Sequence, residues 1–217
     1  MKWVVITSFT EHGYSKLAEF LVKQDVKIFI PIPDEVCKNQ DVRYIPSSFY
    51  RVWRPVLDII FSYGLDVECY RTFQDITNQV DIGLKVAILV LKAKAYGKVN
   101  ESEWLGIIPL RLKPVISQWS GILVVDDYIE YLLLKRIIFP DKITLLDLLL
   151  PTPLDLLAGV KSSLFTWKCR LSEIIKWCIE YIGEYVVRSI DLTDAYRKLL
   201  NNTSYLDFLR ECIGNEV

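Results

Sequence analysis

The residues best placed for chemistry lie in a short polar loop, TSFTEHG, at residues 7–13 of the 217-residue chain. His12 is the only histidine in the sequence, so an acid–base step that needs an imidazole must use it. Glu11 stands next to it and is placed to orient the ring. We therefore predict that His12 and Glu11 are catalytic, with His12 as the base.

The same loop offers groups that bind a substrate. Ser8 and Thr10 supply hydroxyl groups, and Gly13 allows a ligand to approach the backbone closely. The loop follows a predicted buried strand and leads into a helix, where free backbone N–H groups attract anions. The alternative is structural: Ser8, Thr10 and Glu11 cap the helix, and His12 is solvated. The nucleotide-binding patterns GxGxxG and GxxxxGK[ST] do not occur, and we expect no cofactor.

A second candidate is the segment FYRVWRP at residues 49–55, which mixes aromatic and basic residues. Arg51 and Arg54 are predicted to contact a phosphorylated acceptor or an anionic lipid surface, with the aromatic rings entering the interface. The alternative is a segment whose aromatic side chains pack into the core while both arginines face solvent.

Several carboxylates accompany predicted strands. Asp126 and Asp127 follow an apolar strand and invite a metal or acid–base interpretation, but helix capping is the simpler one. Asp75 and Asp81 lie near a strand-to-helix junction and support the hypothesis of a small nuclease or nucleotide-binding protein. They have no positioned partner, so this hypothesis ranks third, and we predict no metal site. Four lysines are expected on the solvated face of the next helix: Lys85, Lys92, Lys94 and Lys98.

Charge and hydropathy exclude some classes of protein. The chain has 26 basic and 27 acidic residues, and 52% of its residues are hydrophobic, which excludes a disordered tail or a cationic nucleic-acid coat. We therefore favour no nucleic-acid partner. The longest apolar stretch, residues 143–160, contains two aspartates and two prolines and is too interrupted to span a membrane. We expect a cytoplasmic protein, and the positive mean hydropathy leaves peripheral membrane association open.

The five cysteines form no CxxC pair. An odd, scattered set is typical of buried, reduced thiols in a cytosolic protein rather than of a disulfide framework or a zinc site. The composition, rich in Ile, Leu, Val, Tyr, Lys and Glu with a single Met, resembles that of thermophile proteins.

Short apolar runs alternate with amphipathic segments through the first two-thirds of the chain. Strands are expected at residues 3–6, 27–31, 42–45, 66–70, 105–110, 121–125 and 143–146. The helices expected between them include one with Pro55 in its first turn that Gly64 ends, and one that Asp127 and Glu130 cap. Such β-α-β units favour right-handed crossovers. The sequence therefore predicts an α/β fold, with a Rossmann-like parallel sheet flanked by helices.

The last quarter of the chain has a different character. From residue 167 onward, apolar residues recur at helical spacing and no strand is apparent. We divide the chain into a Rossmann-like domain, residues 1–159, and a helical C-terminal extension, residues 160–217.

Taken together, these segments resemble the N-terminal, acceptor-side domain of GT-B glycosyltransferases of the family-4 type. The stretches that carry the resemblance are residues 3–8, 27–31, 41–46, 65–67, 87–97, 120–129, 141–143 and 151–155. The segment SGILVVDDYI at residues 120–129 is similar to one strand-and-helix segment of the family. Residues 165–167, FTW, resemble the start of the family's last helix.

The resemblance implies binding of a sugar or lipid-linked acceptor more than it implies turnover. The domain that binds the nucleotide sugar in this family has no counterpart, and Glu173 and Glu180 are one residue too close for its E-x7-E pair. The family's Gly-rich turn is reduced to Gly13, and residues 105–111 hold no histidine where the family has one.

We therefore expect a glycosyltransferase-like acceptor-binding protein that is catalytically incomplete alone and works with a partner that supplies the donor half. The first alternative is a non-enzymatic homo-oligomeric interaction protein of a virus or mobile-element type, with the helical extension as its interface. The small nuclease or nucleotide-binding protein is the second.

Overall fold

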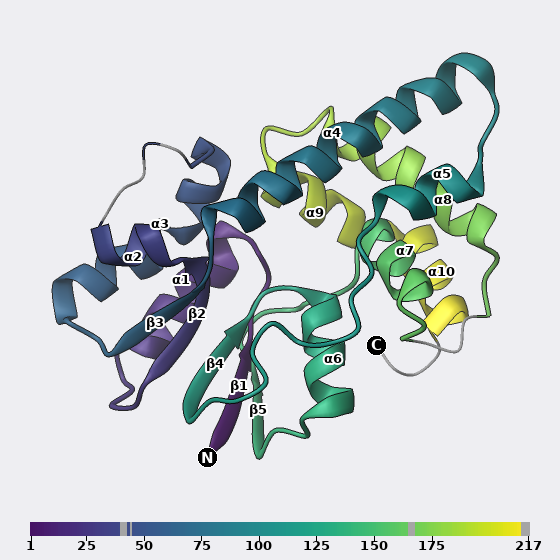
Figure 1. The fold of residues 1–217 in the computed structure, drawn as a ribbon. Helices are drawn as coiled ribbons and strands as arrows, with labels where there is room; N and C mark the ends of the chain where they lie inside the picture. The colour runs from purple at the N-terminus through teal and green to yellow at the C-terminus, as the bar shows by residue number, and fades with distance from the viewer. Residues whose placement is uncertain (40–42, 44, 165–167, 214–217) are drawn as a thin grey trace. The chain divides into compact units, whose positions relative to one another are not determined.

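The computed structural model describes residues 1–39, 43, 45–164 and 168–213 (Figure 1). The chain forms two compact units, each built from two separate stretches. Unit 1 comprises Met1–Thr77 and Lys113–Leu149, and unit 2 comprises Asn78–Leu112 and Leu150–Val217. The boundary predicted at residue 160 came from a change in the sequence pattern, whereas the two units are defined by which segments pack together.

Unit 1 contains a five-stranded parallel sheet with the strand order β3-β2-β4-β1-β5. Its strands are β1 (Lys2–Ile6), β2 (Ile28–Pro33), β3 (Val67–Arg71), β4 (Gly121–Val125) and β5 (Lys142–Leu145). The sheet confirms the predicted α/β class with a Rossmann-like parallel sheet. In the common doubly wound order 3-2-1-4-5, β1 lies beside β2, but here β4 lies between them.

Helices cover both faces of this sheet (Figure 1). The helices of unit 1 are α1 (Glu11–Leu21), α2 (Asp34–Asn39), α3 (Ser47–Tyr63) and α6 (Tyr128–Ile137). Side chains alternate between the faces of a strand, so Trp3 and Val5 pack in the cluster that includes α1 and α3. Val4 and Ile6 pack instead in the cluster that includes Leu134 of α6. Both faces of β1 are buried, which explains its unbroken apolar sequence.

Two predicted strands have other outcomes. The prediction of a strand at residues 105–110 is wrong, because Glu101–Ile107 form the helix α5. The side chain of Asn100 caps this helix by accepting a hydrogen bond from the Ser102 N–H, and Trp104 and Ile108, one turn apart, are buried. Of the strand expected at residues 42–45, residues 42 and 44 lie outside the described residues, and residues 43 and 45 lie in a turn and a bend.

The helix ends predicted from Gly64 and Asp127 are confirmed, whereas the helix start predicted from Pro55 is not. Gly64 ends α3 with a left-handed backbone, φ 63°, as predicted. Pro55 does not lie in the first turn of this helix, because α3 begins eight residues earlier at Ser47. The Asp127 side chain caps α6 by accepting from the Glu130 N–H at 2.9 Å. The Glu130 carboxylate accepts instead from the Val115 N–H at 2.7 Å, so the predicted reciprocal cap is only half formed.

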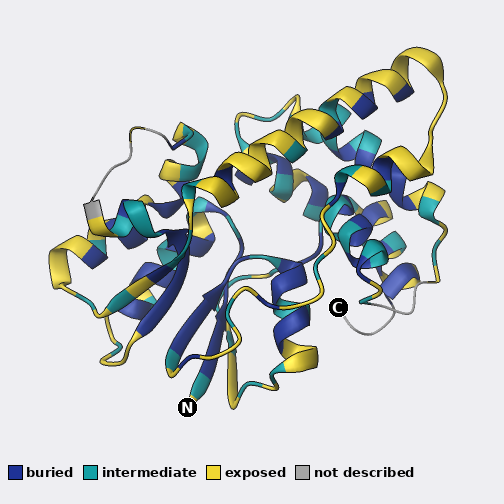
Figure 2. Ribbon diagram, in the orientation of Figure 1, coloured by how far each residue is buried: buried dark blue, intermediate teal, exposed yellow. Residues whose placement is uncertain are grey.

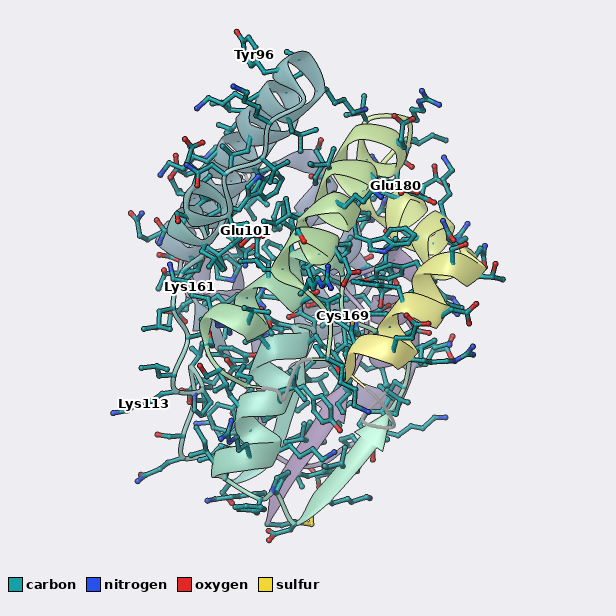
Figure 3. The ribbon with its side chains drawn as sticks, turned by 90° about the vertical axis from the view of Figure 1, so that its right-hand side faces the viewer. Tyr96, Glu101, Lys113, Lys161, Cys169 and Glu180 are labelled. Atoms are coloured by element: carbon teal, nitrogen blue, oxygen red, sulfur yellow. A yellow bond between two sulfur atoms is a disulfide. The ribbon has the colours of Figure 1, made fainter. Side chains whose placement is uncertain are left out.

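Unit 2 is helical. Its elements are most of α4 (Phe73–Tyr96), α5, α7 (Pro153–Lys161), α8 (Leu171–Glu180), the π-helix η1 (Tyr181–Val186), α9 (Leu192–Leu200) and α10 (Thr203–Ile213). One buried cluster joins them, with Trp104, Leu157, Ile175 and Tyr205 among its members. Lys161 donates from Nζ to the carbonyl oxygen of Leu105 at 2.7 Å and so secures the end of α5. Figure 3 labels Lys161, the last residue of α7, and Glu101, the first residue of α5.

No helix among the described residues is long and apolar enough to cross a membrane.

Four of the five cysteines are joined in disulfides, so the prediction of five reduced thiols is wrong. Cys37 pairs with Cys69 within unit 1, and Cys169 pairs with Cys212 within unit 2. Cys178 is free and buried. The pairs are 32 and 43 residues apart in sequence, and their proximity depends on the fold, which explains why spacing alone did not indicate them.

We expect alkylation to distinguish these cysteines. Denaturation without reductant should expose one reactive thiol, Cys178, because only this cysteine is unpaired. Denaturation after reduction should expose all five cysteines. Intact-mass spectrometry after iodoacetamide treatment counts the added groups. Five additions without reductant would contradict both disulfides.

Candidate functional site

The carboxyl ends of β1 and β4 form a topological switch point. The two strands are neighbours, and each is followed by a helix. The chain leaves β1 through α1 toward β2 and leaves β4 through α6 in the opposite direction, toward β5. The two connecting helices pack on opposite faces of the sheet. In open α/β sheets, ligands bind in the crevice at such a point.

A buried ionic cluster lies at this edge of the sheet. The Asp126 carboxylate, whose side chain is 1% exposed, accepts a hydrogen bond from the Arg71 guanidinium at 2.7 Å and another from the Tyr14 hydroxyl at 2.7 Å. These residues come from the end of β3, from α1 and from the loop after β4. The cluster thus joins three segments that are distant in sequence.

The cluster has strongly shifted pKa values. Burial raises the pKa of Asp126, and Arg71 opposes this shift. Burial is the largest influence on the pKa of Arg71 and lowers it, but the charge of Asp126 and the smaller effects of Tyr70, Tyr14 and Asp127 together raise it by more, which keeps the guanidinium protonated. Burial and the adjacent carboxylate raise the pKa of Tyr14 well above its ordinary value. Tyr14 therefore acts here as a neutral hydrogen-bond donor, and the buried ion pair has a structural role.

A second polar cluster surrounds Asp147, which follows β5. Lys16 of α1 donates to its carboxylate at 2.9 Å, and the Ser8 hydroxyl donates to its other oxygen. Burial raises the pKa of Asp147, but the hydrogen bonds from Lys16 and Ser8, the charge of Lys16 and, least of all, the charge of His12 together lower it by more, so the net shift is downward. Asp147 is therefore an ionised carboxylate at neutral pH, and its side chain keeps 17% of its surface exposed.

Hydrogen bonds run in one direction from α1 to this carboxylate. The Gly13 N–H donates to Thr10 Oγ1 at 2.9 Å, and the Thr10 and Ser8 hydroxyl oxygens are 2.7 Å apart. The single Ser8 hydroxyl proton goes to Asp147, so Thr10 must donate to Ser8. Of the predicted caps, the one by Thr10 is confirmed, whereas Ser8 does not cap α1 and donates to Asp147 instead.

Gly13 has a packing role in this loop. A methyl group at this position would lie 2.5 Å from the carbonyl oxygen of Ser8 and 2.8 Å from Thr7 Oγ1. The loop itself fills the space that a side chain at Gly13 would occupy, which holds Ser8 and Thr10 against the start of α1.

The predicted catalytic pair is arranged differently from the expectation. His12 is exposed on the first turn of α1 and lies close enough to Asp147 for its charge to affect that carboxylate. Glu11 pairs with Arg51 of α3, with Oε1 and Nε 3.4 Å apart. Arg54 is exposed further along α3 and lies 3.7 Å from Asp58. The structure thus places Arg51 beside the start of α1, and His12 makes the smallest of the contributions that lower the pKa of Asp147.

The other predicted acids take part in local interactions. Asp75 accepts hydrogen bonds from the Thr72 N–H and hydroxyl at 2.8 Å, at the start of α4. Asp81 accepts from Lys85 at 2.6 Å, one turn along α4. Among the described residues, no three His, Cys, Asp or Glu side chains form a group that could hold a metal ion.

Three important residues were not singled out from the sequence. Lys16 and Tyr14 lie within a helix and Arg71 lies at the end of a strand, so none of them belongs to a recognisable motif. Asp147 did have a signal: like Ser8 and Asp126, it follows the carboxyl end of a parallel strand. From the sequence, Asp147 was interpreted only as an interruption of the apolar stretch at residues 143–160.

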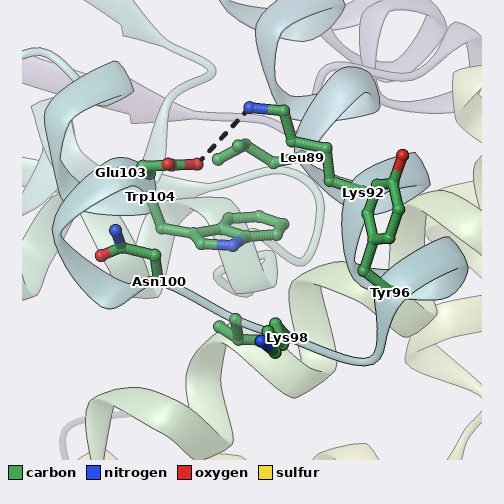
Figure 4. Close-up of a pocket in the computed structure, with 8 residues that line it drawn as sticks. Leu89, Lys92, Tyr96, Lys98, Asn100, Glu103 and Trp104 are labelled. Carbon is green, nitrogen blue, oxygen red and sulfur yellow. Dashed lines mark ion pairs between the residues drawn. The ribbon is translucent and has the colours of Figure 1, made fainter.

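Unit 2 contains a separate pocket at the turn between α4 and α5, with a volume of about 380 Å³ (Figure 4). Leu89 and Trp104 provide its apolar wall, and Lys92 and Glu103 form an ion pair at 3.7 Å across it. Its lining also includes Lys98, so its charged side chains carry a net charge of +1, and it contains no residue of the predicted catalytic or substrate-binding site.

Comparison with known proteins finds no match: no family model fits the chain, and no curated protein and no solved structure is significantly similar to it.

Tyr14→Phe should lower the free energy of unfolding by about 1.5–3 kcal/mol, because the buried Asp126 carboxylate loses a charged hydrogen bond. Chemical denaturation followed by circular dichroism measures the change. Tyr63→Phe is the matched control, since Tyr63 is 65% exposed, and it should change the stability by much less. Equal effects in the two variants would contradict the structural role of the cluster.

Asp147 should contribute to acid sensitivity. Its pKa is lowered in the folded chain, so its stabilisation is present above the unfolded value of about 3.9 and is lost as the pH falls through the folded pKa. Between pH 5 and pH 2, the wild type should therefore lose more stability than Asp147→Asn, which has no charge to lose. Urea denaturation across this range gives both curves. Parallel curves would show that Asp147 is not held ionised.

Proposed function

We propose that unit 1 binds a sugar-type acceptor at the carboxyl ends of β1 and β5, and that the chain is the acceptor-side half of a glycosyl-transfer system. The observation that carries this proposal is the ionised Asp147 held by hydrogen bonds from Ser8 and Lys16, beside the loop and helix start that also carry His12. Carboxylates, ammonium groups and hydroxyls together provide the donors and acceptors that sugar hydroxyls require. The resemblance to the GT-B acceptor domain points to the same class of ligand.

His12 is the proposed general base. It takes the proton of an acceptor hydroxyl as that oxygen bonds to the anomeric carbon of the donor sugar, and the nucleoside diphosphate leaves with the electrons of the broken bond. Asp147, rather than the Glu11 that the sequence suggested, is the proposed acidic neighbour of His12, because Glu11 pairs with Arg51. The donor sugar would come from a partner chain.

Arg51 and Arg54 are the proposed contacts for a phosphate on the acceptor. The pairing of Arg51 with Glu11 brings the exposed side of α3 to the start of α1, next to His12 in sequence. Arg54 lies on the same exposed side, one turn further along. A phosphate with two negative charges competes with the single carboxylates that these arginines now face. The acceptor is therefore a phosphorylated sugar, free or linked to a lipid.

Binding of small probes tests this proposal. Glucose 1-phosphate should bind unit 1 and raise the melting temperature of the chain, while glucose and inorganic phosphate, its two parts, should have smaller effects. Asp147→Asn should weaken binding of glucose 1-phosphate by about tenfold or more, a loss of about 1.4 kcal/mol, measured by titration calorimetry. His12→Ala should also weaken it.

The matched control is Asp141→Asn. Asp141 precedes β5 and accepts a hydrogen bond from the Lys2 N–H, so it lies at the opposite end of the strand that Asp147 follows. This variant should bind the probe as the wild type does. Equal loss in both variants, or no binding of any of the three probes, would contradict the proposed site. Stabilisation by uridine diphosphate glucose alone would show that the chain binds a donor, and would reverse the assignment.

A further inference from the structure

Helix α4 carries an exposed apolar stripe, formed by Val80, Leu84, Ile88 and Leu91. These side chains are exposed by 41%, 62%, 54% and 67%. Figure 2 shows exposed residues along much of the length of α4. Their spacings of four, four and three residues place them on one side of the helix. The stripe extends for about 16 Å along the helix axis. Isolated apolar residues are common on protein surfaces, but a contiguous row of four large ones marks an interaction site.

The opposite side of α4 is already used. Val86, Leu89 and Val90 are buried in the core of unit 2. A helix that is apolar on two opposite sides is typical of one covered on both. The sequence analysis expected lysines on the outer face, and Lys85, Lys92, Lys94 and Lys98 are indeed exposed, but the stripe lies between them.

We propose that the stripe is an interface with a second copy of this chain, in which the two α4 helices pack antiparallel about a two-fold axis. The charges on its edge support this arrangement. Asp81 and Lys92 are eleven residues, or three helical turns, apart and therefore border the same edge of the stripe. In an antiparallel two-fold pair, this edge meets its own copy with the direction reversed. Asp81 of each chain then lies near Lys92 of the other, so the symmetry produces two ion pairs.

The present partners of these charges do not prevent the new pairing. Asp81 is 55% exposed and pairs with Lys85 on its own helix, and Lys92 is 56% exposed and lies 3.7 Å from Glu103. Exposed pairs of this kind contribute little to stability, so exchanging or sharing partners costs little. In a parallel pair, this edge would meet the other edge of the stripe, and Asp81 would not meet Lys92. The lysines beside the stripe would also suit an anionic membrane, but a second copy, unlike a membrane, gives Asp81 a partner of opposite charge.

Light scattering after size exclusion, over a range of protein concentrations, tests the proposal. The wild type should form a species of twice the 25.3 kDa mass of one chain. Ile88→Lys should raise the dissociation constant of this dimer by about 100-fold, because a charge would enter the centre of both copies of the stripe. The matched control is Ile190→Lys: Ile190 is 89% exposed in unit 2 outside α4, and its replacement should leave the dimer intact.

A charge exchange tests the antiparallel arrangement. Asp81→Lys alone and Lys92→Asp alone should each weaken the dimer, and the double variant should restore it, because each pair is then re-formed with reversed signs. A wild type that stays monomeric at every concentration overturns the proposal, as does a dimer that Ile88→Lys leaves unchanged. A double variant weaker than both single variants overturns the antiparallel pairing. The chain could instead stay monomeric and bind vesicles containing phosphatidylserine, with this binding lost in Ile88→Lys. That result would assign the stripe to a membrane and overturn the proposed dimer.

The inference is independent of the proposed acceptor site. Asp147 belongs to unit 1 and the stripe to unit 2, so the failure of one proposal does not affect the other.

Discussion

The buried carboxylate of Asp126 constrains the whole carboxyl edge of the parallel sheet. A charge that is 1% exposed must be compensated, and Arg71 from β3 and Tyr14 from α1 provide that compensation. The three partners come from different parts of the chain, so satisfying one charge fixes the positions of two strand ends and one helix. The loop that presents Ser8, Thr10 and His12 begins directly after β1, the strand that neighbours β4, and its geometry depends on this anchor.

Asp126 and Asp147 lie at the same edge of the sheet but differ in burial, and burial decides whether each carboxylate can meet a ligand. Asp126 accepts two hydrogen bonds in a dry environment and has little opportunity to meet a ligand. Asp147 is ionised and retains contact with solvent, and its partners Lys16 and Ser8 are themselves groups that recognise hydroxyls and phosphates. The buried cluster and the accessible one share α1, which carries both Tyr14 and Lys16, and a buried anchor of this kind is the support that a binding site needs in order to keep its geometry.

Much of unit 1 could be predicted, because its signals are local. Residues 3–6 and 121–125 are unbroken apolar runs, as parallel strands buried on both faces must be, and both were correctly identified. The strand order could not be predicted, because the position of β4 between β1 and β2 depends on pairing between strands that are distant in sequence. The apolar residues 105–110 were misread as a strand because a short buried helix has the same composition, and only Asn100 indicated a helix start.

In the site, the loop residues were found from the sequence, but Arg71 and Tyr14 were not. Their importance comes from the charge of Asp126, which lies 55 residues from Arg71 and 112 residues from Tyr14 in the sequence.

The division of each unit into two stretches has a consequence for synthesis on the ribosome. Unit 1 is complete once residue 149 has emerged, so its sheet can close while the chain is still growing. Helices α4 and α5 are made much earlier than the segments that cover them, which begin at residue 150. Until those segments arrive, α4 exposes both of its apolar sides, which makes this interval the one in which the nascent chain most needs protection from aggregation.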